Sequence, residues 1–191
     1  MRSTTTTRVA GNSRTPGCWW PNAAWSRSWT GFEPHGGTIV NPPNDTLEYR
    51  YATKEDYPTL AVLNRRLIED EHHRNTMTVA ELEQRMAGWL EGEYEAVIFS
   101  RAGRVLGYGL YRREPGWYYL RQFFVDRDYR RQGIGRTAMK WLMQHAWQNA
   151  PRLRVEVLVG NTPGIAFWHA VGFTDYCLTL EQPIAMSNAD P

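Results

Sequence analysis

The chain has 191 residues, of which 42% are hydrophobic, so it is long enough to bury one core and is expected to form a single globular domain. Four of its 22 basic residues and one of its 20 acids lie in residues 1–44, which leaves 18 basic and 19 acidic residues in 45–191. The resulting net charge of −1 argues against a general nucleic-acid binder. No apolar run approaches the ~18–20 residues that a membrane-spanning helix needs, so no membrane partner is expected.

The two cysteines, Cys18 and Cys177, lie far apart in the sequence. They offer neither a disulfide framework nor the spacing of a metal site. This usage fits a reducing, cytoplasmic setting, and we expect no metal.

Residues 1–44 differ in composition from the rest of the chain. They are rich in Thr, Ser, Gly, Pro and Trp and show neither helical nor strand periodicity. We therefore predict a disordered extension, followed by a domain over 45–185 and a short tail over 186–191. The alternative is docking onto the domain through four tryptophans, Trp19, Trp20, Trp25 and Trp29.

The apolar pattern after residue 45 predicts both strands and helices. Residues 46–53 alternate as a strand, and the leucines of 54–71 share one helical face. Thr78 and Glu81 form a capping box at the start of a second helix. The remaining expected elements are strands over 95–100, 105–113 and 117–125, a helix ending near 150, a strand over 153–160, a helix over about 163–170 and a strand over 173–182. This order predicts an α/β fold with a mixed sheet and helices on both faces.

The stretch "VDRDYRRQGIGRTAMK" contains a strand end, two glycines and the start of a helix. The first turn of a helix has amides without intrahelical acceptors, and glycine lets a ligand approach them without a Cβ in the way. Positive charge is added by three arginines, Arg130, Arg131 and Arg136. The pattern predicts a phosphate site at Gly133 and Gly135; the alternative is a glycine-containing turn with solvated arginines. "GIGRTA" also fits a dinucleotide-binding fingerprint, but that motif should directly follow the first strand.

"FFVDRDYRRQGIGR" resembles the acetyl-CoA-binding signature of the GCN5-related N-acetyltransferase (GNAT) family, whose fixed positions match Arg130, Gly133 and Gly135. "NTPGIAFWHAVGF" is similar to a second stretch of the family, matching at Asn161, Phe167, Gly172 and Phe173. Two positions depart from that stretch, because Gly164 stands in place of Ala and Trp168 in place of Tyr. The resemblance covers residues 46–182.

The resemblance implies a central, splayed sheet that binds acetyl-CoA, with the pantetheine arm entering beside the strand 117–125. Residues implied at the donor are Phe124, Val125, Arg130, Arg131, Gln132, Gly133, Gly135, Arg136, Asn161 and Trp168. The implied reaction is transfer of an acetyl group to an amine by direct attack on the thioester, without a metal. The implied acceptor is a small-molecule or peptide amine, and a homodimer is an expectation that comes from the family alone.

The acceptor side is less defined by the resemblance. Family members often carry a carboxylate base near the middle of the central strand, where this chain has Arg121 and Gln122. Strand alternation puts these two side chains on opposite faces. Arg121 is expected either to bind an acceptor carboxylate or to pair with an acid such as Glu156.

The proton-transfer groups are predicted only as candidates. "IEDEHHRN" offers Glu71 and His72 as bases, and its alternative is a solvated helix end. The indole of Trp168 will not give up its proton near neutral pH, so His169 is a candidate to protonate the departing thiolate. Because Trp168 and Arg121 depart from the family pattern, a non-catalytic acyl-CoA-binding or interaction domain remains the alternative function.

Overall fold

The computed structural model describes residues 46–148 and 151–182, so the predictions for residues 1–44 and 186–191 lie outside the described residues. The chain divides into two compact units. All described helices and strands lie in the unit Thr38–Thr174, whereas residues 175–182 belong to the other unit. The domain boundaries at 45 and 185 stay predictions.

A five-stranded sheet with the order β1-β2-β3-β4-β5 forms the centre of the unit Thr38–Thr174. Its strands are β1 (Glu48–Tyr51), β2 (Tyr94–Arg101), β3 (Arg104–Glu114), β4 (Trp117–Val125) and β5 (Leu153–Val155). The first four strands pair antiparallel and β5 runs parallel to β4, so the predicted mixed sheet is confirmed.

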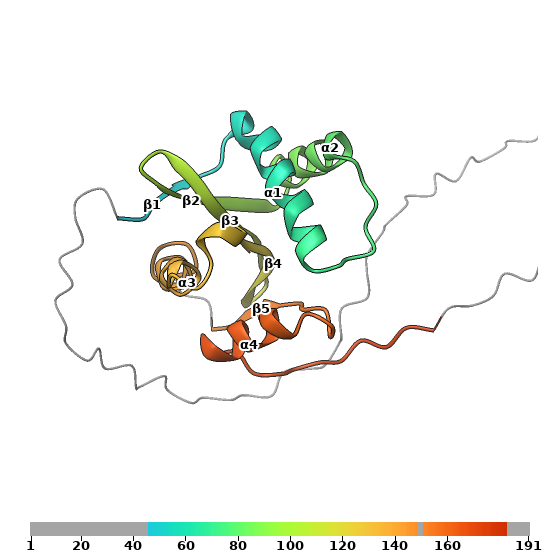
Figure 1. Cartoon of the computed structure of the whole chain (residues 1–191). Coiled ribbons are helices and arrows are strands. Elements are labelled where there is room, and N and C mark those ends of the chain that lie inside the picture. The colour runs from blue at the N-terminus through green and yellow to red at the C-terminus, as the bar shows by residue number, and fades with distance from the viewer. Residues whose placement is uncertain (1–45, 149–150, 183–191) are drawn as a thin grey trace, which may run out of the picture. The chain divides into compact units, whose positions relative to one another are not determined.

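Helices cover both faces of this sheet (Figure 1). The helices are α1 (Tyr57–Asp70), α2 (Val79–Leu90), α3 (Ile134–His145) and α4 (Thr162–Ala170), and short 3₁₀ turns occupy Lys54–Asp56 and Arg127–Tyr129. Leu60 of α1 and Met86 of α2 are buried in one apolar cluster with Ile98 of β2. Leu142 of α3 and Trp168 of α4 are buried in another. The predicted layering is therefore confirmed.

A side-chain cap defines where α2 begins, and hydrogen bonds of Asp56 hold the start of α1. The Thr78 amide donates to Glu81 Oε2 at 2.7 Å and the Glu81 amide donates to Thr78 Oγ1 at 3.3 Å, which is the predicted capping box. Before α1, Asp56 accepts two hydrogen bonds from Arg50, at 2.6 and 2.7 Å, and one from the Thr53 amide at 2.8 Å. These bonds attach the start of α1 to β1.

Three expected elements in the C-terminal half differ from the structure. The third helix ends at His145 rather than near 150, because the chain turns there to bury Trp147 edge-on against Tyr111, with ring centroids 5.4 Å apart. The strand expected over 153–160 ends at Val155. No strand forms over 173–182, whose apolar residues Tyr176, Leu178 and Leu180 are 65%, 65% and 84% exposed, so the alternation there does not bury one face.

Cys177 is disulfide-bonded, whereas the sequence predicted no disulfide framework; Cys18 lies outside the described residues. Among the described residues, no helix has the length and apolar character of a membrane span. The same residues contain no group of three or more His, Cys, Asp or Glu side chains placed to hold a metal ion.

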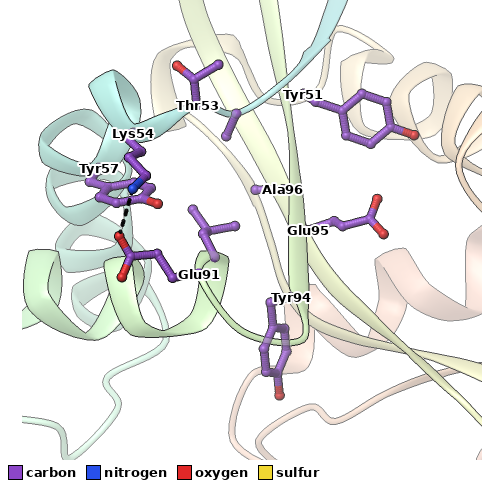
Figure 2. Close-up of a pocket in the computed structure, with 10 residues that line it drawn as sticks. Tyr51, Thr53, Lys54, Tyr57, Glu91, Tyr94, Glu95 and Ala96 are labelled. Carbon is purple, nitrogen blue, oxygen red and sulfur yellow. Dashed lines mark ion pairs between the residues drawn. The ribbon is translucent and has the colours of Figure 1, made fainter.

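A pocket of about 610 Å³ lies at the N-terminal end of α1 (Figure 2). Residues of β1, β2 and the end of α2 line it, and Lys54 pairs with Glu91 across it at 3.4 Å. Arg130, predicted at the donor, and Glu71, a predicted base, lie instead near the C-terminal end of α1, a helix length of about 20 Å away. The pocket therefore holds none of the predicted site residues.

Candidate functional site

The N-terminus of α3 presents free amides to solvent. Gly133 caps the helix at φ +80° and Arg131 has φ +61°, so the chain reverses sharply before the first turn. The amides of Ile134, Gly135 and Arg136 have no intrahelical acceptor, whereas the amide and hydroxyl of Thr137 both donate to Gly133 O. Arg131 and Arg136 are exposed beside them. Such a helix start suits an anion such as a phosphate.

Gly135 has a packing reason to be glycine. A Cβ built on it would lie 3.1 Å from Cε2 and 3.3 Å from Cζ of Phe167 on α4, whereas a Cβ on Gly133 would meet nothing within 4 Å. The Phe167 ring stacks on Phe123, with centroids 5.8 Å apart. The second glycine thus lets α4 approach α3, a role that sequence reasoning had given to a ligand.

A gap opens between β4 and β5 because the two strands pair only over Tyr118–Leu120 and Leu153–Val155. The Asp126 amide donates to Leu106 O at 2.7 Å, and backbone groups of an antiparallel strand alternate between its two edges. The backbones of Phe123 and Val125 therefore face the gap. Phe124 faces the other way, since its carbonyl oxygen would lie 2.1 Å from a Cβ at Gly107 of β3.

Phe123 is consequently a candidate for the site, which sequence reasoning did not name and for which it gave Phe124. The Phe124 side chain is only 2% exposed and packs on the α1/α2 face with Tyr108. The alternation of the strand was the available signal. Once the register of β3 and β4 is known, this alternation shows that the backbone groups of every second residue of β4 face the gap.

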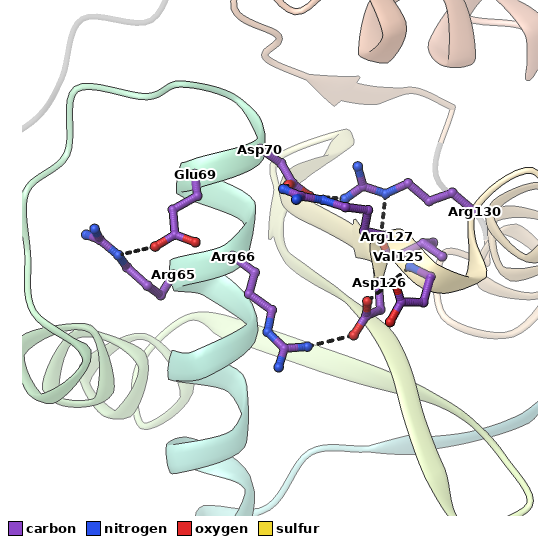
Figure 3. Close-up of polar contacts among 9 residues, drawn as sticks. Arg65, Arg66, Glu69, Asp70, Val125, Asp126, Arg127 and Arg130 are labelled. Carbon is purple, nitrogen blue, oxygen red and sulfur yellow. Dashed lines mark hydrogen bonds and ion pairs between the residues drawn. The ribbon is translucent and has the colours of Figure 1, made fainter.

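Arg130 ties the loop before α3 to α1 and β4 (Figure 3). Its Nε donates to Val125 O at 2.8 Å, and its guanidinium shares the Asp70 carboxylate with Arg127. Burial alone would raise the pKa of Asp70, but these two arginines hold it below its usual value. Since the Arg130 side chain is occupied in this way, Arg131 and Arg136 are better placed to reach a phosphate.

Glu71 lies at the end of α1 and contacts the start of α4. The His72 amide donates to Glu69 O and the His73 amide to Ile68 O, with His72 at φ +49°, which is a Schellman-type helix end. Glu71 Oε1 accepts from Asn161 Nδ2 at 3.2 Å, and burial raises the pKa of this carboxyl above its usual value. His72 is exposed.

The α1 end is therefore not simply a solvated helix terminus. Glu69, His72 and His73 are exposed as that alternative expects, but Asp70 and Glu71 turn inward. Asn161 also caps α4, because its Oδ1 accepts from the Gly164 amide at 2.9 Å. A Cβ at Gly164 would lie 2.6 Å from Asn161 Nδ2, which explains the glycine at this position.

Arg121 and Gln122 lie on the same face of β4, contrary to the expectation from alternation. Leu110 pairs with Gln122 but Tyr111 pairs with Leu120, so Arg121 is an extra, bulged residue. The bulge turns Gln122 to the α1/α2 side, where it accepts from the Tyr108 hydroxyl at 2.9 Å and donates to Asn64 Oδ1 at 2.9 Å.

The Arg121 guanidinium lies over the ring of Trp89 on α2, with Cζ 4.6 Å from the centroid. The suggested ion pair with Glu156 does not form. Glu156 accepts from the Tyr119 hydroxyl at 2.8 Å instead. Arg121 is exposed and available to a ligand.

Trp168 is part of the aromatic core between α4 and the sheet. It is 8% exposed and meets Phe123, Phe167 and Phe173 edge-on, with ring centroids 5.0–5.6 Å apart. His169, the next residue, is exposed, as is Gln132, whose Nε2 donates to Asp128 O at 3.3 Å. Trp168 thus supports the strand that borders the gap.

A gap in the sheet beside a helix start that suits an anion agrees with the resemblance to the GNAT family. The model of the "Acetyltransferase (GNAT) family" matches residues 44–173. The chain therefore belongs to the GNAT family, and the predicted N-acetyltransferase class is confirmed. No curated protein matches the chain.

Solved structures share the fold at low sequence identity. A possible acetyltransferase from Clostridium difficile 630 is 17% identical, with a TM-score of 0.61 over 73% of this chain and 98% of that chain. The aminoglycoside N-acetyltransferase AAC(6')-Iy in complex with CoA is 13% identical, with a TM-score of 0.60 over 77% and 100%. An aminoglycoside acetyltransferase from an uncultured soil metagenomic sample, in complex with sisomicin, is 13% identical, with a TM-score of 0.55 over 74% and 97%.

Proposed function

We propose that the protein transfers an acetyl group from acetyl-CoA to the amine of a small molecule by direct attack. The observation that carries this proposal is the gap beside β4, where the backbones of Phe123 and Val125 face away from β3 next to the amides of α3. Acetyl-CoA would supply an activated thioester carbonyl. CoA complexes among the structural neighbours support the choice of donor.

The residues of the gap fit such a donor. The backbone groups of Phe123 and the amide of Val125 can pair with the pantetheine arm as a neighbouring strand would, whereas Val125 O already accepts from Arg130 Nε. The amides of Ile134 to Arg136, with Arg131 and Arg136, suit the pyrophosphate. Gln132 lies in the loop before α3, Asn161 caps the start of α4, and Trp168 packs against Phe123.

Glu71 is the candidate base that the geometry favours over His72. Its carboxyl is half-buried, has a raised pKa and lies beside Asn161, whereas His72 is exposed. The amine nitrogen forms a bond to the acetyl carbon, the carbon–sulfur bond breaks, and Glu71 accepts the amine proton. A CoA thiol has a pKa near that of cysteine, about 8.5, so the thiolate can leave and take a proton from water or His169.

The donor site is tested by removing charge at the start of α3. The double variant Arg131→Ala/Arg136→Ala should bind acetyl-CoA about tenfold more weakly, because two exposed arginines contribute modestly. Lys140→Ala, on an exposed position further along α3, is the matched control and should stay within about twofold. Equal calorimetric affinity in the double variant and the control would contradict the phosphate site.

A non-catalytic acyl-CoA-binding domain is the second candidate, because the buried Trp168 supplies no acidic hydroxyl. The two functions differ in turnover. Each amine of a panel is incubated with acetyl-CoA and release of the CoA thiol is measured. A transferase should release thiol and form acetylated amine with at least one of them. Binding of acetyl-CoA with no product from any amine would favour the binding domain. The aminoglycoside acetyltransferases among the structural neighbours support small amines as the first compounds to try.

A further inference from the structure

Two guanidinium groups share the indole ring of Trp89. Cζ of Arg85 lies 4.7 Å from the ring centroid and Cζ of Arg121 lies 4.6 Å from it. Arg85 precedes Trp89 by one turn of α2, whereas Arg121 is the bulged residue of β4. Bulges often re-aim side chains beside functional sites. The two charges therefore converge from separate elements onto one place.

Neither arginine has an anionic partner in 46–148 or 151–182. Arg85 Nε is buried without a hydrogen-bond acceptor, and burial together with the charge of Arg121 lowers the pKa of Arg85. The contrast with Arg127 and Arg130 is direct, because that pair shares the Asp70 carboxylate. Stacking on Trp89 offsets part of the cost of burial but satisfies few of the ten guanidinium N–H donors.

The arginine pair lies on the side of β4 that faces α1 and α2, as Gln122 does. The charges of Arg85 and Glu71 both act on the pKa of the buried Tyr108 hydroxyl, so both groups are near it. That hydroxyl donates to Gln122, the neighbour of Arg121. A ligand bound by the arginines would therefore have Glu71 within reach of its other end.

We propose that Arg85 and Arg121 bind an oxyanion of the acceptor, so that the acceptor is a small amine that also carries a carboxylate or a phosphate. Guanidinium forks match both groups in two-point geometry. This inference rests on the acetyl transfer proposed above and adds the acceptor class. The same two charges repel polycationic amines, so aminoglycosides should be poor acceptors here.

The test compares amines that differ only in the anion. Suitable pairs are glycine and glycinamide, 4-aminobutyrate and 4-aminobutanamide, and phosphoethanolamine and ethanolamine, with spermidine and an aminoglycoside as polycations. In the full chain, at least one anionic member should exceed its uncharged partner at least tenfold in kcat/KM. Whether the carboxylate or the phosphate pairs show the preference identifies the oxyanion.

The variants Arg85→Met and Arg121→Met should lower kcat/KM for the preferred anionic amine roughly tenfold to a hundredfold. They should leave its uncharged partner and the acetyl-CoA affinity within about twofold. Arg121→Lys keeps the charge but not the fork and should be intermediate. Arg113→Met, at an exposed position of β3, is the matched control. It should change kcat/KM neither for the anionic amine nor for its uncharged partner.

A second readout does not depend on turnover. The preferred anionic amine, or inorganic phosphate if the phosphate pair is preferred, should raise the melting temperature of the wild type but not of Arg121→Met. Better turnover of an uncharged or polycationic amine would overturn the inference while supporting acetyl transfer. Equal stabilisation of the wild type and Arg121→Met by every anion would overturn it too. Absence of turnover with every amine, together with anion stabilisation that requires Arg121, would instead count against the transferase and support the anion site.

Discussion

The packing of Gly135 against Phe167 makes a prediction that separates a structural glycine from a ligand-binding one. Alanine would place a Cβ 3.1 Å from the Phe167 ring, and that ring is held by its stack on Phe123 and its contact with Trp168. Overpacking of this kind costs about 1–3 kcal/mol, against a gain of up to about 1 kcal/mol from removing a helical glycine. We expect Gly135→Ala to lose about 1 kcal/mol of unfolding free energy, a fall of roughly 2–4 °C in Tm.

A double-mutant cycle with Phe167→Leu tests the cause. In that background Gly135→Ala should be neutral or stabilising, which gives a coupling energy of about 1–2 kcal/mol by urea unfolding. Gly133→Ala is the control, because φ +80° costs about 1–2 kcal/mol there but no side chain lies near. Its effect should not change in the Phe167→Leu background. Additive losses for Gly135→Ala and Phe167→Leu, or loss of acetyl-CoA binding at unchanged stability, would refute the packing argument.

Three further predictions concern single side chains. Arg50 helps to lower the pKa of Asp56 to about 2 from 3.8, so Asp56→Asn should lose about 2 kcal/mol of unfolding free energy above pH 5. Urea unfolding should show this difference between variant and wild type vanish as the pH falls through about 2. Burial raises the pKa of Glu71, so Glu71→Gln should become more stable relative to the wild type as the pH rises through that pKa. Its kcat should fall at least tenfold, and its pH–rate profile should no longer show the acid limb. Wild-type activity in Glu71→Gln would exclude it as the base. Trp168→Tyr should change kcat by less than about tenfold while lowering Tm, since Trp168 is buried among three aromatic rings; a thousandfold gain in kcat would favour the binding domain.

The sequence predicted those parts of the fold that depend on local pattern. The capping box at Thr78, the interior position of β4 and the helix that opens at Gly133 follow from residue type and spacing. The strand expected over 173–182 failed because alternation alone does not supply a pairing partner. The early end of α3 at His145 depends on the burial of Trp147, which is a tertiary contact.

The candidate site was predictable where its residues come from one segment and not where they meet across segments. Arg130, Gly133 and Gly135 could be singled out within one segment, but the bond from Arg130 to Val125 O and the shared Asp70 depend on how α1 ends beside β4, and the packing of Gly135 depends on Phe167 of α4. Glu71 was a candidate only by its place in an acidic run, and its contact with Asn161 spans 90 residues of sequence. No sequence pattern pointed to Arg85, because its interest lies in sharing the Trp89 ring with Arg121, which belongs to another element.

The bulge at Arg121 lies between the proposed donor side and the proposed acceptor side. In a regular strand Gln122 would face the aromatic core of α3 and α4, where its amide would lack the partners it has in Tyr108 and Asn64. The extra residue moves Gln122 to the face that already holds Arg121, and so gathers polar groups on one side of an otherwise apolar strand. Pairing of β4 with β5 also stops at Leu120, immediately before the bulge. A single backbone irregularity therefore coincides with the start of the gap between β4 and β5 and gathers polar groups beside it, and the proposed function would use this proximity to bring an amine toward the thioester.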